Sequence, residues 1–222
     1  MRSRLAINIG QPTLFSELTR STTTTSYNLE VQEFSLPNAE VSYYSKFFTS
    51  EESHYFFHAL NNEVKWRQDK ISLYGREIDL PRETAWYGDT DKNYTFSGIR
   101  LTPEPWLPAL LDIRQRIEKV AQVRFNSVML NLYRDGKDGI SWHTDAEPEL
   151  GRNPIIGSVS FGGTRRFMLR HRHDKQAKCE LELANGSFLL MGGETQHFWQ
   201  HQIPKTSKTV APRINLTFRT IL

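Results

Sequence analysis

The sequence predicts an α+β domain that is mainly β, a barrel or sandwich of strands buttressed by two helices. Helix signals lie before residue 125, and short strand patterns separated by turn residues fill the chain from Phe125 onward. Many short strands that follow helical elements favour a barrel or a sandwich. A chain of 222 residues can bury a substantial core in one such domain.

Residues 1–36 are polar and include the low-complexity run "TRSTTTTSYN". We expect them to form a mobile or loosely docked extension, and residues 37–222 to form a single domain. The first apolar stretch, in "MRSRLAINIGQPTL", is too short and broken for a signal peptide.

Two helices are predicted. The first follows Thr49, where "TSEE" has the spacing of a capping box, and runs through "SHYFFHALNN". The second opens in "TPEPW" and continues through "LPALLDIRQRIEKVAQ". Its apolar residues recur at helical spacing, which predicts a face packed on a sheet; these residues are Leu110, Ile113, Ile117 and Val120.

The predicted strands follow in order. "FNSVMLNLYRDG" ends at a turn, and "PIIGSVSFGGTRRFMLRH" reads as two strands joined by a Gly-Gly bend. "CELELANGSFLLMGG" predicts a hairpin with an Asn-Gly turn. "APRINLTFRTIL" closes the chain as a last strand.

Two of these strands carry a polar face. In "VMLNLY", Asn131 and Tyr133 share a face, and the same alternation in "RINLTFR" groups Arg213, Asn215, Thr217 and Arg219. A solvated outer face explains this pattern. The alternative is a barrel interior that holds an anionic ligand, since two arginines suit a small dicarboxylate. Periodicity alone leaves both interpretations open.

Composition narrows the class of protein. Hydrophobic residues make up 38% and charged residues 24%, which is ordinary for a globular protein, and no apolar run is long enough for a transmembrane helix. The one cysteine, Cys179, cannot form an internal disulfide, so a reducing compartment is expected: cytoplasmic, or nuclear in a eukaryote. A net charge of +3 is compatible with a nucleic-acid partner, and we expect a monomer that does not bind membranes.

"SWHTDAEPEL" offers two metal-competent side chains, His143 and Asp145, directly after the turn-rich "RDGKDG". Such a pair by itself is weak evidence for a metal site. The candidates for a third ligand, from the residues alone, are His197 and His201 and, more remotely, His171 and His173.

The motifs taken together are specific. "YGD", "YTFSG", "PEPW", "NLYRDG", "HTDAE", "GSVSFG", "GSFLLM" and "APRINLTFR" resemble the AlkB family of Fe(II)- and 2-oxoglutarate-dependent dioxygenases. The branch that repairs alkylated bases in duplex DNA is the most similar, and the resemblance covers roughly residues 70–222. It implies a double-stranded β-helix (jelly-roll) core, with nucleic-acid-recognition hairpins at about residues 70–100.

The resemblance also implies the cofactor. His201 becomes the third ligand, beside His143 and Asp145, because its distance from Arg213 matches the family pattern. Two histidines and a carboxylate on one face of Fe(II) leave three positions open, enough for 2-oxoglutarate and O2.

By similarity, the polar strand faces would hold the cosubstrate. Arg213, Tyr133 and Asn215 are implied at its distal carboxylate. Asn131 and Arg219 are implied at the end near the metal, and Arg219 also steadies Asp145.

The activity that the resemblance implies is oxidative demethylation of DNA. 1-Methyladenine and 3-methylcytosine would be converted back to adenine and cytosine, with release of formaldehyde, succinate and CO2. The base must be flipped out of a duplex to reach the metal. Tyr94 and Phe96 match positions that line the lesion pocket, and Glu147 matches an acidic contact to the base edge.

The stretch "SLYGREIDLPRE" matches a hairpin that inserts an aromatic ring, here Tyr74, into the base stack. Arg76 and Arg82 are then expected at phosphates. The chain departs from the family in its loop "PKTSKTVAPR", which keeps only Lys205 and Lys208 of a basic cluster, and in having Tyr instead of Phe as the wedge.

Two alternatives remain at this stage. One is the same chemistry on single-stranded DNA, RNA, lipid or protein. The other is a non-catalytic nucleic-acid-binding barrel, against which the intact set of ligands and arginines argues.

Overall fold

The computed structural model describes residues 30–73, 76–90, 94–96 and 99–222. For residues 71–73, 76, 94–96 and 99–101 it describes the backbone alone. Tyr74, the expected wedge, therefore lies outside the described residues, as do the side chains of Arg76, Tyr94 and Phe96.

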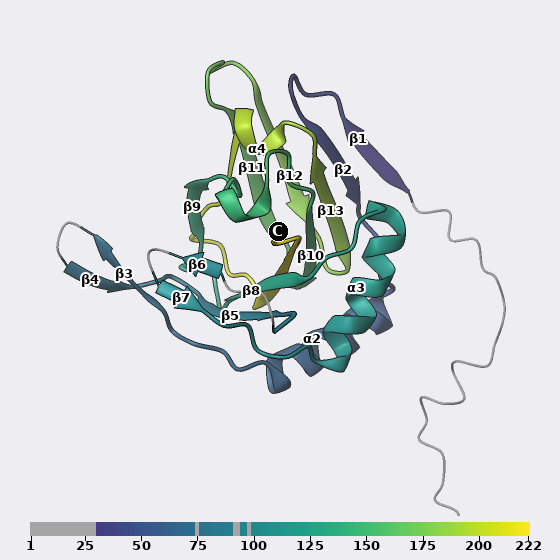
Figure 1. Ribbon diagram of the computed structural model, residues 1–222, viewed down its shortest axis with the longest axis vertical. Helices are drawn as coiled ribbons and strands as arrows, with labels where there is room; N and C mark the ends of the chain where they lie inside the picture. Colours follow the sequence, from purple (N-terminus) through teal and green to yellow (C-terminus); the bar gives the residue numbers. More distant parts are fainter. Residues whose placement is uncertain (1–29, 74–75, 91–93, 97–98) are drawn as a thin grey trace, which may run out of the picture.

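Two facing sheets form the core (Figure 1). The seven-stranded major sheet has the order β1 (Val31–Phe34), β2 (Glu40–Tyr44), β13 (Ser187–Gly192), β10 (Ile156–Gly162), β15 (Arg213–Arg219), β8 (Ser127–Tyr133), β5 (Glu83–Gly88). The four-stranded minor sheet has the order β12 (Lys178–Leu183), β11 (Arg165–His171), β14 (Trp199–Ile203), β9 (Ile140–His143). Strands β8 to β15 thus pass between the two sheets as in a jelly roll, which confirms the predicted fold class.

Two small hairpins extend this core. Strand β3 (Lys70–Leu73) pairs with β4 (Arg76–Asp79), and β6 (Tyr94–Phe96) pairs with β7 (Ile99–Leu101). Figure 1 shows the β3–β4 hairpin projecting away from the sheets. Both hairpins lie within the stretch of about residues 70–100 for which the resemblance implies recognition hairpins, and their role in nucleic-acid recognition stays a prediction.

The helices lie on the outer face of the major sheet. Helix α2 (Ser50–Glu63) begins with the predicted capping box, in which Thr49 and Glu52 cap each other's backbone N–H groups. Helix α3 (Pro108–Ala121) begins later than the predicted "TPEPW" start. A proline disfavours helical geometry in the residue before it, so Leu107 becomes the N-cap and Pro108 the first helical residue. Short segments complete the fold: η1 (Pro148–Leu150) and α4 (Thr195–Phe198).

Two further expectations need correction. Residues 31–34 belong to the expected extension, but they form β1, which pairs with β2 at the edge of the major sheet. The predicted Asn-Gly hairpin does not pair its own strands, because β12 lies in the minor sheet and β13 in the major sheet. Gly186 has a φ of 74°, and its N–H donates to the carbonyl of Ser160. The turn is thereby tied to β10 while the chain crosses between sheets.

The two faces of the major sheet differ completely. Its outer face contributes Leu130, Ile214 and Leu216 to a buried apolar cluster that includes both long helices. Its inner face carries Asn131, Tyr133, Arg213, Asn215 and Thr217, all less than 9% exposed. The polar alternation therefore marks the interior of the jelly roll and not a solvated surface.

Candidate metal and cosubstrate site

Three potential metal ligands converge between the sheets. His143 on β9 and His201 on β14 are direct cross-strand partners, with ring centroids 4.2 Å apart. Asp145 follows the end of β9, and its Oδ2 lies 3.8 Å from Nε2 of His201. The ligand atoms of these three residues lie within 4.8 Å of one another. Two imidazoles and one carboxylate in this arrangement fit Fe(II).

Neighbouring groups orient each ligand. Nδ1 of His143 donates to the carbonyl of Ser141 at 2.8 Å, so Nε2 carries the lone pair for a metal. The backbone N–H of Asp145 donates to Oε1 of the buried Gln196 at 2.9 Å. Nη2 of Arg219 donates to Oδ1 of Asp145 at 2.5 Å, which leaves Oδ2 on the side of His201.

The charges around the ligands favour their metal-binding forms. Burial acts to raise the pKa of Asp145, but the charge of the Arg219 guanidinium, its hydrogen bond to the carboxylate and the electrostatic effect of the two neighbouring imidazoles outweigh burial, and the pKa is lowered. Burial, followed by repulsion from His143, lowers the pKa of His201 to about 3. The carboxylate is thus ionised and His201 neutral near pH 7, as coordination requires.

The ligands open into a cavity of about 380 Å³ that the inner faces of both sheets enclose. Arg213, 1% exposed, lies in its wall and donates from Nη2 to Oγ of Ser160 at 2.9 Å. Its Nε and Nη1 are buried and have no hydrogen-bond partner among the described residues. Burial lowers the pKa of Arg213 to about 10, so the group stays charged near pH 7.

Buried N–H donors on a charged guanidinium call for an acceptor. A carboxylate fits the two donors of Arg213, because guanidinium and carboxylate match bidentately. The ring of Tyr133 lies below the guanidinium, 5.2 Å from centroid to Cζ. The cavity therefore suits a small dicarboxylate such as 2-oxoglutarate, with one end at Arg213.

Asn215 is engaged differently from what the resemblance implies. Its Nδ2 donates to Oγ of Ser158 at 2.9 Å and to the carbonyl of Val159 at 3.1 Å. Both amide hydrogens are therefore used within the sheet. A contact between Asn215 and the distal carboxylate stays a prediction, and it requires the amide to change partners.

Two expected substrate contacts are described. Glu147 lines the cavity, and its Oε2 is buried without a partner among the described residues. Arg82 differs from the expected phosphate contact. Its side chain is buried in the cavity wall and donates to Asn131 and to the carbonyl of Gly139. Because this guanidinium is buried and its hydrogen bonds go to acceptors inside the protein, it cannot reach a DNA phosphate at the surface. The expected phosphate contact of Arg82 is therefore wrong.

The other histidines lie elsewhere. Nε2 of His197 contacts the carbonyl of Arg152 and Oδ1 of Asn153. Nδ1 of His171 accepts from the backbone N–H groups of His173 and Asp174. Within the part of the chain that the structure describes, only His143, Asp145 and His201 form a group that could hold a metal.

Sequence reasoning missed residues that support the site. Ser158 and Ser160 hold Asn215 and Arg213, and their alternation in "GSVSFG" is a signal that could have placed them on the inner face. Gln196 orients Asp145 but follows no periodic pattern, so nothing in the sequence marks it. Within the described residues, no helix has both the length and the apolar character that a membrane span needs.

Comparisons with known proteins agree with this geometry. The family model of the 2OG-Fe(II) oxygenase superfamily matches residues 40–219. The DNA oxidative demethylase ALKBH2 of Bos taurus is 40% identical over 190 residues, which cover 81% of this chain and 68% of that protein. The alpha-ketoglutarate-dependent dioxygenase alkB homolog 3 of Mus musculus is 39% identical over 203 residues, which cover 86% and 70%.

Among solved structures, OsALKBH1 has a TM-score of 0.58 at 15% identity, covering 86% of this chain and 100% of that one, a likeness of fold. Fold and site together define an Fe(II)- and 2-oxoglutarate-dependent dioxygenase. Within that superfamily, the chain belongs to the AlkB family and is ALKBH2-like.

Proposed function

We propose that this chain is a DNA oxidative demethylase that removes alkyl groups from base nitrogens with Fe(II), O2 and 2-oxoglutarate, and releases formaldehyde, succinate and CO2. The observation that carries the proposal is that Nε and Nη1 of Arg213 are buried without a hydrogen-bond acceptor among the described residues, in the same cavity as His143, Asp145 and His201. Relatives named DNA oxidative demethylase ALKBH2, about 40% identical, support DNA as the substrate.

The chain's own residues bind and orient the reactants. His143, Asp145 and His201 hold the metal, and Arg213 holds the distal carboxylate of 2-oxoglutarate, with Asn131 and Arg219 nearer the metal. When bound, iron and 2-oxoglutarate supply the activation of O2 and the oxidation of the methyl C–H bond. The hydrogen bond from Arg219 keeps one oxygen of Asp145 turned away from the ligand side.

Glu147 supports a cationic base as the substrate. 1-Methyladenine and 3-methylcytosine carry a positive charge and an exocyclic amino group, and a buried carboxylate oxygen is a good acceptor for such an amine. Glu147 lines the cavity, and its buried Oε2 has no hydrogen-bond partner in the described part of the chain. The proposal also includes Tyr94 and Phe96 as aromatic walls of the lesion pocket.

Strand preference is the finer part of the proposal. The β3–β4 hairpin projects from the core and carries Tyr74 between its strands, so we assign duplex opening to this hairpin. Arg76 beside it, and Lys205 and Lys208 in the loop before β15, would contact phosphates. We propose that the protein acts as a monomer, in the cytoplasm or, in a eukaryote, in the nucleus.

The test measures formaldehyde and succinate release on a 1-methyladenine oligonucleotide, with the strand single or paired. We expect both products, dependent on Fe(II) and 2-oxoglutarate, and none above background from the unmethylated oligonucleotide. Methylated RNA forms a third arm. Turnover on RNA alone would replace the proposed substrate, and no succinate on any arm would contradict the proposed function.

A further inference from the structure

Arg82 occupies an unexpected place in the cavity wall. It lies between the β3–β4 hairpin and β5, and it is 9% exposed. Its Nε donates to Oδ1 of Asn131 at 2.7 Å, and its Nη1 donates to the carbonyl of Gly139 at 3.3 Å. Both acceptors are neutral oxygens. A buried guanidinium at this position therefore needs a reason other than an ion pair with either of them.

The contact fixes the orientation of the Asn131 side chain. A carboxamide has an oxygen that accepts and an amino group that donates, and nothing in its shape distinguishes the two ends. Arginine can only donate, so the end that faces Arg82 must be the oxygen. The amino end of Asn131 is then the end available to an acceptor in the cavity, whose wall Asn131 also forms.

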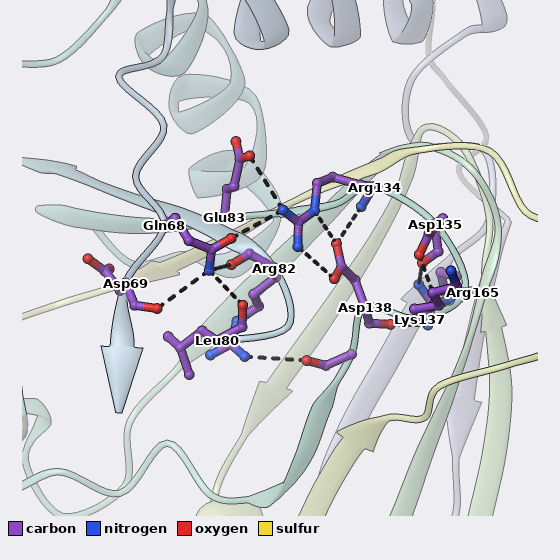
Figure 2. Close-up of polar contacts among 11 residues, drawn as sticks. Gln68, Asp69, Leu80, Arg82, Glu83, Arg134, Asp135, Lys137, Asp138 and Arg165 are labelled. Carbon is purple, nitrogen blue, oxygen red and sulfur yellow. Dashed lines mark hydrogen bonds and ion pairs between the residues drawn. The ribbon is translucent and has the colours of Figure 1, made fainter. Parts of the chain in front are cut away.

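A network of polar contacts holds Arg82 in place (Figure 2). The backbone carbonyl of Arg82 accepts from Nε2 of Gln68 at 3.3 Å, and Oε1 of Gln68 accepts from Arg134 at 3.1 Å. Arg134 in turn forms a two-pronged ion pair with the buried Asp138, at 2.8 and 3.0 Å. The turn of residues 134–139, which precedes β9, thus braces the residue that contacts Asn131.

We propose that Arg82 is a positioning residue for 2-oxoglutarate, which holds the Asn131 carboxamide with its amino group toward the cosubstrate. This inference rests on the proposed function, because it takes 2-oxoglutarate as the acceptor in the cavity. Arg82 itself touches neither the cosubstrate nor DNA in this assignment, and it acts through Asn131.

The experiment measures binding, so that it does not depend on turnover. 2-Oxoglutarate is titrated calorimetrically into protein loaded with Mn²⁺, which replaces iron without redox chemistry. Arg82→Met should raise the Kd of 2-oxoglutarate about tenfold, the effect of losing one orienting hydrogen bond to a charged group. Mn²⁺ affinity should stay unchanged. Arg166→Met is the matched control and should leave the Kd unchanged, since Arg166 is exposed on β11 outside the cavity and lies 3.5 Å from Glu180.

A double-mutant cycle tests the route of the effect. If Arg82 acts through Asn131, Arg82→Met combined with Asn131→Ala should bind 2-oxoglutarate no more weakly than Asn131→Ala alone, within about twofold. Losses that multiply would overturn the proposal, as would an unchanged Kd in Arg82→Met. DNA affinity and its salt dependence should match wild type; a shallower salt slope would show that Arg82 contacts phosphate.

Asn131→Asp covers the case in which Arg82→Met does not fold. It keeps an acceptor for Arg82 but removes the amino group, so the protein should unfold near the wild-type temperature and lose 2-oxoglutarate affinity. Retained affinity would overturn the proposal. Failure of wild type to bind 2-oxoglutarate would instead contradict the proposed function, and the two failures are therefore distinguishable.

Discussion

The two sheets of the jelly roll supply different parts of the site. The short strands β9 and β14 of the minor sheet carry His143 and His201, and Asp145 follows β9 directly. The seven-residue strands β8 and β15 of the major sheet carry Asn131 and Arg213. One side of the cavity thus provides neutral and anionic metal ligands, and the other side provides cationic and amide donors for a carboxylate.

From this difference we infer that separate halves of the fold would hold the metal and the cosubstrate. The helices pack against the outer face of the major sheet, so the strands that carry its inner side chains are held rigidly. The minor-sheet pairing shifts register between His201 and Ile203, and Asp145 lies beyond a strand end. Its ligands depend instead on side-chain contacts from Gln196 and Arg219. Arg219, on β15, joins the two halves.

The largest effect should come from the minor sheet. His143→Ala removes one of the three ligands, so we expect loss of metal binding and no measurable turnover, with the fold intact. Metal binding is measured by calorimetry and the fold by circular dichroism. His197→Ala is the control, because His197 contacts residues 152 and 153 and should leave metal affinity unchanged. Normal metal affinity in His143→Ala, or its loss in His197→Ala, would refute the ligand assignment.

A change in the major sheet should weaken binding of 2-oxoglutarate and leave metal binding unaffected. Arg213→Met should weaken 2-oxoglutarate binding about ten- to hundredfold, since a charge-assisted bond is worth roughly 1.5–3 kcal/mol. Metal affinity should stay at the wild-type value. Arg166→Met, on the exposed face of β11, is the control. An unchanged Michaelis constant for 2-oxoglutarate would show that another residue binds its distal carboxylate.

The β3–β4 hairpin is a third region. A change there should alter the preference for duplex DNA, unlike the changes in the two sheets, which should alter metal or 2-oxoglutarate binding. Tyr74→Ala should lower the rate on duplex DNA by about tenfold while single-strand repair falls little, because an aromatic ring that replaces the flipped base is worth about 1–3 kcal/mol. The ratio of double- to single-strand rates is the measurement. Equal loss on both substrates would make Tyr74 structural, and the wedge would have to lie elsewhere.

The last prediction concerns pH and the stability of the metal-free protein, not its activity. Burial lowers the pKa of His201 to about 3, whereas an unfolded histidine titrates near 6.5. The unfolded state therefore binds more protons between these values, and the stabilising contribution present above pH 6.5 is lost as pH falls toward 3, by up to about 1.4 kcal/mol per pH unit. The free energy of unfolding, measured by urea unfolding at several pH values between 6.5 and 4.5, should fall less steeply with decreasing pH in His201→Gln than in wild type. Parallel curves for the two proteins would contradict this.

Local chemistry made much of the fold predictable. The capping box at Thr49 and Glu52 is a short-range hydrogen-bond pattern, and the structure reproduces it. Strand alternation correctly grouped Arg213 with Asn215 and Asn131 with Tyr133, because successive side chains of a strand point to opposite faces. His143 and Asp145 were recognisable as a pair for the same local reason.

Tertiary structure decided the rest. Four histidines were open as third ligand from the residues alone, and only the pairing of β14 with β9 sets His201 opposite His143. The sequence placed Arg82 at a surface hairpin, but packing against Asn131 and the turn before β9 buries it. Alternation fixes which side chains share a face of a strand. It cannot tell what covers that face, because the covering sheet is built from residues far away in the chain.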